Sequence, residues 1–177
     1  MLTIGSLFSG IGGIEYGLEQ HGMRTIWQSE IDPYASRVLR KHWPDVPNLG
    51  DITTITEAPP ADVICGGFPC QDLSSAGKQA GINAARSGLF FELMRIVRLV
   101  RPRFILLENV AALLSRSEWA GAVFGELAAS GYDAQWDCIP ASAVGAPHRR
   151  DRVFIVGYTR VADAEQLGCE SRGGFEE

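Results

Sequence analysis

Two side chains in this sequence are well placed for covalent and acid–base chemistry. Cys70 stands between Pro69 and Gln71, in a loop that follows the apolar run at residues 62–65. Backbone amides at a strand end can stabilise a thiolate, which is the nucleophilic form of cysteine. Glu108 directly follows a second apolar run, and a carboxyl at such a position can donate a proton. The pair therefore suggests a nucleophile and an acid at the edge of a sheet, although a helix N-terminal acid is an alternative reading of Glu108.

Polar residues near the acid and near the end of the sequence extend this set. Arg150 and Arg152 alternate along the approach to a strand, so we expect both side chains to point to the same side. An arginine there could hold a carbonyl oxygen, and the alternative is the solvated rim of a hairpin. Asn109 lies beside Glu108 and is equally explained as a helix cap.

A glycine-rich turn at residues 8–13, Phe-Ser-Gly-Ile-Gly-Gly, lies between an expected strand and an expected helix. Open α/β sheets bind ligands at such turns. The dinucleotide pattern would place a glycine at position 15, where Glu15 would instead repel a pyrophosphate. Glu30 ends the next strand and could bind two ribose hydroxyls, while Asp51 could accept a hydrogen bond from an adenine amino group. These acids favour a nucleoside ligand such as S-adenosylmethionine over NAD, although each alone is more often a solvated turn residue.

One reaction would use all of these groups together. Carbon 5 of cytosine is not nucleophilic, but a thiolate that adds to carbon 6, with an acid protonating N3, turns carbon 5 into an enamine carbon. That carbon can attack a methyl sulfonium. An arginine on the O2 atom of the base would stabilise the adduct.

Alternating apolar runs and helical patterns predict an α/β fold with a mainly parallel sheet to position these residues. The connection at 140–151 is too short for a crossover helix, so the last two strands are predicted to be antiparallel. Residues 66–87 form a long loop, and loops of that length are usually functional or disordered. The expected strands are 2–8, 25–29, 62–65, 104–107, 132–139 and 153–157, and the expected helices are 14–20, 33–42, 89–100 and 118–129.

Composition bounds the class of protein. A chain of 177 residues with 46% hydrophobic and 21% charged residues fits one globular domain. Four cysteines without zinc-site spacing, no signal peptide and no bilayer-spanning run predict free thiols, no metal site and a cytoplasmic setting. Cys65 and Cys138 are expected in the core, and Cys169 in the tail. The net charge of −5 argues on its own against nucleic acid, although arginines gather locally.

The chain resembles the DNA (cytosine-5)-methyltransferases over about residues 2–157, motif by motif and in the family's order. His148 departs from the pattern, because the family usually has glutamine ahead of the two arginines. The matching segments are Phe8 to Gly13, Glu30-Ile31-Asp32, Gly50-Asp51-Ile52, Pro69-Cys70-Gln71 with Ser74, Gly77, Lys78 and Gln79 following, Leu89-Phe90-Phe91, Glu108-Asn109-Val110 and Arg150-Asp151-Arg152.

The resemblance implies a Rossmann-like fold that binds S-adenosylmethionine and methylates cytosine in double-stranded DNA after base flipping. It implies Cys70 as nucleophile, Glu108 as the N3 acid, Arg152 holding the base, Arg150 supporting the loop and Asn109 positioning the proline–cysteine turn. The implied cofactor contacts are Phe8, Gly10, Gly12, Gly13, Glu30, Ile31, Asp51, Ile52, Pro69 and Leu89, and the implied DNA-contacting residues are Gln71, Ser74 and Lys78.

The resemblance also predicts how the chain is organised. Residues 1–157 would form an incomplete catalytic domain, and 158–177 a flexible tail or the start of a linker, because the family continues with a target-recognition domain and a closing segment. We therefore expect DNA and possibly a second polypeptide with the recognition domain as partners, in a prokaryotic or phage-like restriction–modification setting. The alternatives are an RNA cytosine-5 methyltransferase, a non-catalytic fragment that binds cofactor or DNA, and, more distantly, an NAD oxidoreductase.

Overall fold

A computed structural model describes residues 1–69 and 88–159 of the chain, and its centre is a six-stranded sheet in the order β2-β1-β3-β4-β6-β5. The strands β1 to β4 are parallel, and β6 runs antiparallel to both β4 and β5. The mainly parallel sheet and its antiparallel C-terminal hairpin are therefore confirmed. The strands are β1 (Thr3–Leu7), β2 (Arg24–Ser29), β3 (Val63–Gly67), β4 (Phe104–Val110), β5 (Asp133–Pro140) and β6 (Asp151–Tyr158).

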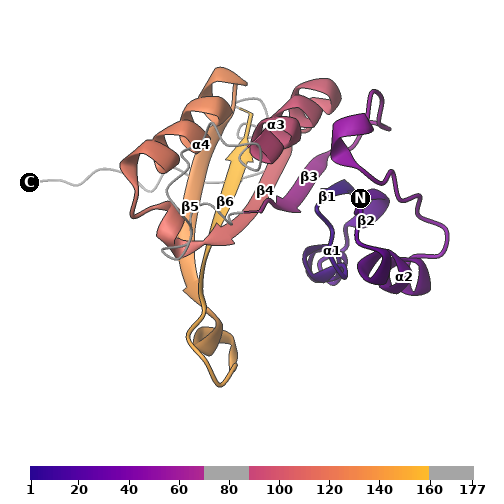
Figure 1. Ribbon diagram of the computed structural model, residues 1–177, viewed down its shortest axis with the longest axis horizontal. Coiled ribbons are helices and arrows are strands. Elements are labelled where there is room, and N and C mark those ends of the chain that lie inside the picture. Colours follow the sequence, from indigo (N-terminus) through magenta and orange to yellow (C-terminus); the bar gives the residue numbers. More distant parts are fainter. Residues whose placement is uncertain (70–87, 160–177) are drawn as a thin grey trace, which may run out of the picture.

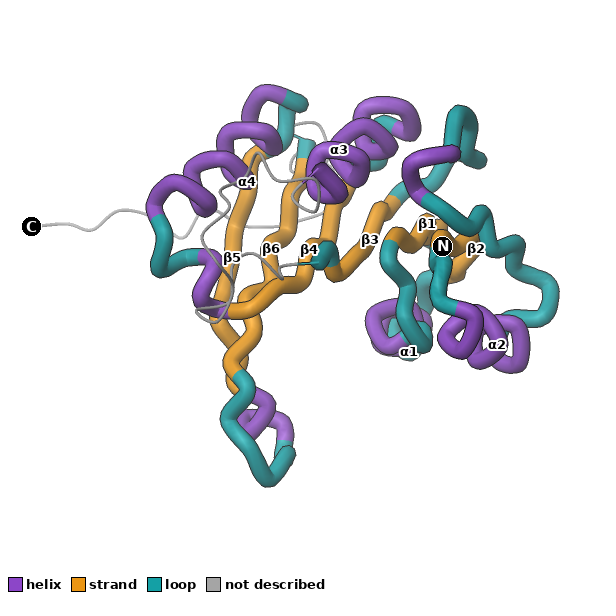
Figure 2. Tube along the Cα trace, in the orientation of Figure 1, coloured by secondary structure: helices purple, strands orange, loops and turns teal. Residues whose placement is uncertain are grey.

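Helices cover the sheet from both sides, as in doubly wound folds (Figure 1). Two helices lie against the β1–β2 half on one side, and two others lie along β3 to β5 on the opposite side (Figure 2). Short 3₁₀ turns connect several elements. The helices are α1 (Gly13–Glu19), α2 (Pro33–His42), α3 (Gly88–Val100) and α4 (Ser117–Ala129), and the 3₁₀ turns are η1 (Ile52–Thr54), η3 (Ala111–Leu113) and η4 (Ala141–Val144).

Local signals explain why α2 has the bounds that the sequence predicts. Asp32 caps the helix, because its Oδ1 accepts hydrogen bonds from the backbone N–H groups of Tyr34 at 2.9 Å and Ala35 at 2.8 Å. Pro33 follows at the first helical position, where its missing N–H leaves no bond unmade. Capping and backbone preference thus agree at this helix start.

Alternation along β4 divides the core into two layers. Ile105 and Leu107 are fully buried in the larger cluster, together with residues of α3 and α4. Phe104 and Leu106 point the other way and pack against a smaller cluster that includes Ile4 and residues of α1. Among the described residues, no helix is long and apolar enough to cross a membrane.

The largest differences from the sequence prediction are the ends of β3 and β4, the start of β6 at Asp151, and one cysteine. β3 continues through Gly66 and Gly67, and β4 continues through Glu108 and Asn109. Gly66 belongs to the strand because it pairs with Leu7 of β1, and glycine is required there because a Cβ would lie 2.5 Å from the Leu7 carbonyl oxygen. The prediction that Cys65 is buried is confirmed.

Cys138 is exposed, so its expected place in the core was wrong. The residue lies on β5, which is the edge strand of the sheet. α4 covers this strand at Trp136, whose ring centroid lies 4.5 Å from that of Phe124. Cys138 follows Trp136 by two residues on the edge strand, and its thiol is exposed to solvent.

Candidate active site

The turn after β1 has a backbone that favours glycine. Gly10 and Gly12 have φ values of 55° and 89°, in the left-handed region that side chains disfavour. A Cβ at position 12 would also lie 2.3 Å from the ring of Trp43, which packs behind the turn. Phe8 has a φ of 54° although it carries a side chain. Strained backbone of this kind gathers at ligand sites.

Glu30 ties this turn to the next one. Its Oε2 accepts a hydrogen bond from the backbone N–H of Gly10 at 2.8 Å, and its Oε1 accepts one from the N–H of Asp32 at 2.7 Å. Each carboxylate oxygen can accept more than one hydrogen bond. The carboxylate is therefore fixed in orientation and still able to accept from a pair of hydroxyl groups.

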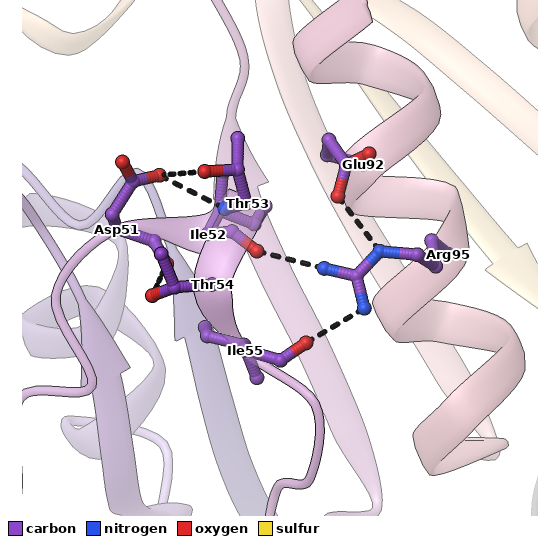
Figure 3. Close-up of polar contacts among 7 residues, drawn as sticks. All are labelled: Asp51, Ile52, Thr53, Thr54, Ile55, Glu92 and Arg95. Carbon is purple, nitrogen blue, oxygen red and sulfur yellow. Dashed lines mark hydrogen bonds and ion pairs between the residues drawn. The ribbon is translucent and has the colours of Figure 1, made fainter.

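Asp51 caps the η1 turn. Its Oδ1 accepts hydrogen bonds from the backbone N–H of Thr53 at 2.9 Å and from the Thr53 hydroxyl at 2.8 Å (Figure 3). The backbone hydrogen bond, followed by the hydroxyl bond, lowers the pKa of this exposed carboxyl. Asp51 is thus a carboxylate at neutral pH and can accept from a ligand amino group.

These acids share a pocket of about 300 Å³ at the carboxyl ends of the parallel strands. Of the predicted cofactor residues, Gly10 contacts the pocket acid Glu30, Gly13 lines a neighbouring cavity, and Gly12 packs against Trp43. The others line the pocket itself. The lining residues are Phe8, Ser29, Glu30, Ile31, Gly50, Asp51, Ile52, Gly67, Pro69 and Leu89.

Sequence reasoning missed two pocket residues, Ser29 and Gly67, whereas Gly50 belongs to the Gly50-Asp51-Ile52 segment named above. Ser29 immediately precedes Glu30, and its hydroxyl donates to the Gly50 carbonyl at 2.7 Å. That position beside the acid is a signal that could identify it. The sequence places Gly67 in the loop, because its place at the end of β3 depends on the neighbouring strand.

Glu108 forms an ion pair with Arg152, with 3.1 Å between Glu108 Oε1 and Arg152 Nε. The strand register explains this contact: Glu108 lies opposite Phe154, and Arg152 precedes Phe154 by two residues in β6 and so lies on the same face. The side chains are 27% and 24% exposed, so solvent reaches both. A Cβ at Gly67 would lie 2.9 Å from Glu108 Oε2, so glycine leaves room for the acid.

Asn109 connects β4 to the segment that precedes Cys70. Its side chain is 3% exposed, and Nδ2 donates to the carbonyl of Phe68 at 3.1 Å. Its Oδ1 accepts from the backbone N–H of Val110 at 2.8 Å. Asn109 is therefore a strand residue and does not cap a helix. Cys70, Gln71, Ser74 and Lys78 lie outside the described residues.

A row of cavities joins the glycine turn to the arginines. A cavity of about 580 Å³ is lined by Phe8 and Gly67, which also line the first pocket, and by Glu108. A third, of about 430 Å³, is lined by Glu108, Arg150 and Arg152. The structure thus brings both arginines and the acid to one cavity. Within residues 1–69 and 88–159, no cluster of possible metal ligands occurs.

The sequence predicts that Glu15 lies where it would repel a bound pyrophosphate. In the structure Glu15 is instead buried. Its side chain is 1% exposed, and Oε1 has no hydrogen-bond partner among the described residues. Burial raises the pKa of Glu15, and the nearby hydroxyls of Ser6 and Ser9 oppose the shift. Burial, with a smaller effect of Glu15, also raises the pKa of Cys65.

Comparison with known proteins identifies the same family as the sequence motifs do. The family described as C-5 cytosine-specific DNA methylase matches residues 2–171. The type II methyltransferase M2.BsuMI of Bacillus subtilis is 41% identical over 161 residues, covering 88% of this chain and 41% of the relative. M.BsuFI, also of Bacillus subtilis, is 37% identical, and the alignment covers 89% of this chain and 39% of M.BsuFI.

Solved structures agree in fold. A protein of an E. coli prophage, described as a DNA modification methyltransferase, superposes with a TM-score of 0.76 at 27% identity, covering 92% of this chain and 48% of that one. The Dnmt2 methyltransferase of S. pombe, at 23% identity, has a TM-score of 0.74 and shares the fold over 90% of this chain and 51% of its own. The chain spans about 40% of the curated relatives' length. With residues 2–171 matched by one family, the chain belongs to the C-5 cytosine-specific DNA methylases.

Proposed function

We propose that this chain binds S-adenosylmethionine and supplies the catalytic groups that methylate carbon 5 of cytosine in DNA. The observation that supports this most directly is the row of cavities. It begins at the two nucleoside-binding acids and ends at the Glu108–Arg152 pair. A cofactor and a base bound at its two ends would meet beside Glu108.

The first pocket fits an adenosine group. Glu30 offers acceptors for two ribose hydroxyls, and Asp51 offers an acceptor for an adenine amino group. Phe8, Ile31 and Leu89 supply apolar walls, which suit a purine ring. S-Adenosylmethionine, when bound, would supply an electrophilic methyl group on its sulfur.

The second end of the row would hold the target base. In the proposed reaction the Cys70 thiolate forms a bond to carbon 6, and Glu108 transfers a proton to N3. Arg152 holds the O2 atom and, through its ion pair, orients Glu108. Asn109 fixes the carbonyl of Phe68, two residues before the nucleophile. Carbon 5 of the adduct would then take the methyl group, with S-adenosylhomocysteine as the leaving group. Loss of the carbon 5 proton to water would expel the Cys70 thiolate, and return of the N3 proton to Glu108 would leave 5-methylcytosine and both side chains in their starting forms.

The open face of the β4–β6–β5 region supports a role for further polypeptide in the complete enzyme. On the side away from α3 and α4, Leu106 and Phe154 are partly exposed and Val156 is 41% exposed. No described helix covers this part of the sheet (Figure 1). We propose that the remaining length seen in the relatives packs here and supplies DNA recognition, in the same or a second polypeptide.

Cofactor binding is tested on this chain by calorimetry with S-adenosylmethionine. Asp51→Asn keeps an oxygen toward Thr53 but can present an amide donor to the ligand, so we expect affinity to fall about ten- to a hundredfold. Asp45→Asn, a change at an exposed loop acid, is the matched control. Equal affinities of the Asp51→Asn variant and the unmodified chain would contradict the assignment.

The covalent step is tested with duplex DNA that contains 5-fluorocytosine, which traps the adduct because the carbon 5 substituent cannot leave as a proton. The chain is joined to the C-terminal part of M2.BsuMI and incubated with DNA and S-adenosylmethionine. We expect an adduct that Cys70→Ser abolishes and that Cys138→Ser, at the exposed cysteine, retains. An adduct that persists in Cys70→Ser would refute the proposed nucleophile. The same assay with tRNA separates RNA from DNA as substrate.

A further inference from the structure

Arg95 on α3 directs its guanidinium at the η1 turn. Nη1 donates to the carbonyl oxygen of Ile55 at 2.7 Å, and Nη2 donates to that of Ile52 at 2.8 Å (Figure 3). Nε forms an ion pair with Glu92 at 2.7 Å, one turn earlier on the same helix. Ile55 and Ile52 precede Arg95 by 40 and 43 positions in the sequence.

One of the two residues whose carbonyls Arg95 holds, Ile52, belongs to a wall of the proposed cofactor pocket. Ile52 lines the pocket and follows the pocket acid Asp51. Leu89 lines the pocket from the first turn of α3, the helix that carries Arg95. Arg95 therefore connects the η1 wall to the helix that provides another wall, without itself lining the pocket.

We propose that Arg95 is a positioning residue for cofactor binding, which sets the distance and orientation of the Asp51–Ile52 wall relative to α3. This proposal rests on the proposed function of the pocket. A planar guanidinium can reach two carbonyls at once in a fixed geometry, whereas a lysine ammonium is a single point charge on a flexible stem. Glu92 holds the third nitrogen, Nε, and so fixes the rotation of the guanidinium.

Arg98 provides a matched control on the same helix. It forms an ion pair with Glu126 on α4, and its side chain is 44% exposed, compared with 39% for Arg95. Both arginines connect α3 to another element and have similar exposure, Arg95 through hydrogen bonds to two carbonyls and Arg98 through an ion pair. They also differ in that Arg95 has a partner, Ile52, that lines the proposed cofactor pocket.

The first test measures the wall directly in the chain without ligand. Amide hydrogen exchange is followed at Thr53, Thr54 and Ile55, whose N–H groups donate to Asp51 and Ile52. In Arg95→Met, which keeps most of the side-chain packing, we expect these amides to exchange about tenfold faster or more, because local opening becomes easier. Arg98→Met should leave their exchange unchanged.

The second test measures the affinity for S-adenosylmethionine by calorimetry. Arg95→Met should raise the Kd about tenfold, Arg95→Lys should raise it by less, and Arg98→Met should not change it. The effect of Arg95→Met should shrink in an Asp51→Ala background, because both changes act on one wall.

Three results would overturn the proposal. These are unchanged exchange at residues 53–55 in Arg95→Met, faster exchange with an unchanged Kd, or equal effects of Arg95→Met and Arg98→Met on both measurements. An unmodified chain that does not bind S-adenosylmethionine would refute the proposed function of the pocket. The exchange rates would still decide whether Arg95 holds this wall.

Discussion

Replacing Glu15 with glutamine should change how the stability of the chain depends on pH. The Glu15 side chain is 1% exposed, and burial raises the pKa of its carboxyl above the ordinary value of 4.5. Ser6 and Ser9 offer hydroxyls nearby, and the buried Cys65 thiol lies within electrostatic range. No cation contributes to the pKa shift of Glu15 in the described part of the chain, and burial outweighs the opposing hydrogen bonds, so folding shifts the equilibrium toward the neutral acid.

The sign of the effect follows from the direction of the shift. The unfolded chain loses this proton near pH 4.5, whereas the folded chain keeps it to higher pH. The stability associated with neutral Glu15 is therefore fully present below about pH 4.5. It declines by up to about 1.4 kcal/mol per pH unit as the pH rises to the folded pKa. Glutamine does not titrate, so Glu15→Gln lacks this decline.

Urea unfolding followed by tryptophan fluorescence measures the effect from about pH 5 to about pH 8. The free energy of unfolding of Glu15→Gln minus that of the unmodified chain should increase with pH until the folded carboxyl ionises. Glu57→Gln, a change at an exposed glutamate, should show no comparable slope. A difference for Glu15→Gln that stays constant with pH would refute the argument that burial raises the pKa of this acid.

Three further substitutions test close contacts at the site. Gly12→Ala would place a Cβ 2.3 Å from the Trp43 ring at a φ of 89°, and we expect urea unfolding to show a loss of about 2 kcal/mol or more. Asn109→Ala would leave a buried backbone carbonyl without its donor, and should lower the free energy of unfolding by about 1 to 3 kcal/mol in the same assay. Gly67→Ala would place a Cβ 2.9 Å from Glu108 Oε2, at the end of a flexible side chain. Its stability should change by less than about 1 kcal/mol, while methyl transfer by the completed enzyme should slow about tenfold or more, because the acid is displaced.

Gly125→Ala is the control for these backbone changes. Position 125 lies on α4, and apart from the backbone of its own helix no atom of the described residues lies within 4 Å of an added Cβ. Alanine should stabilise this helix by up to about 1 kcal/mol, since it loses less conformational entropy on folding than glycine. A Gly12→Ala variant as stable as Gly125→Ala would contradict the packing argument at the turn.

Local sequence signals predicted the elements whose ends are set locally. The start of α2 at Pro33 follows from the capping Asp32, and the end of α4 follows from Gly131, which has a φ of 88°. β3 and β4 end later than predicted because their ends depend on neighbouring strands. Gly66 pairs with Leu7 of β1, a contact that its own flanking residues do not reveal.

The candidate site shows the same division between local and long-range information. Glu30 and Asp51 could be predicted because each follows a recognisable element and chemistry restricts the residue type. The two carbonyl bonds of Arg95 could not, since the carbonyls lie on a turn about 40 residues earlier. In the sequence Arg95 is one of two arginines on the polar side of α3, and nothing in the spacing distinguishes it from Arg98. Its distinct role depends on the packing of α3 beside η1.

Hydrogen bonds within the chain fix the acids at the proposed cofactor end of the site, and this has an energetic consequence. Both oxygens of Glu30 accept from backbone N–H groups, Asp51 is held by Thr53, and Ile52 is held by Arg95. A carboxylate oriented in this way loses little conformational entropy when it accepts a ligand hydroxyl. Glu30 therefore has two inseparable roles: a glutamine there would turn an N–H donor toward the N–H of Gly10 or Asp32. The acid that would recognise the ribose is also required to hold the turn that would contact it.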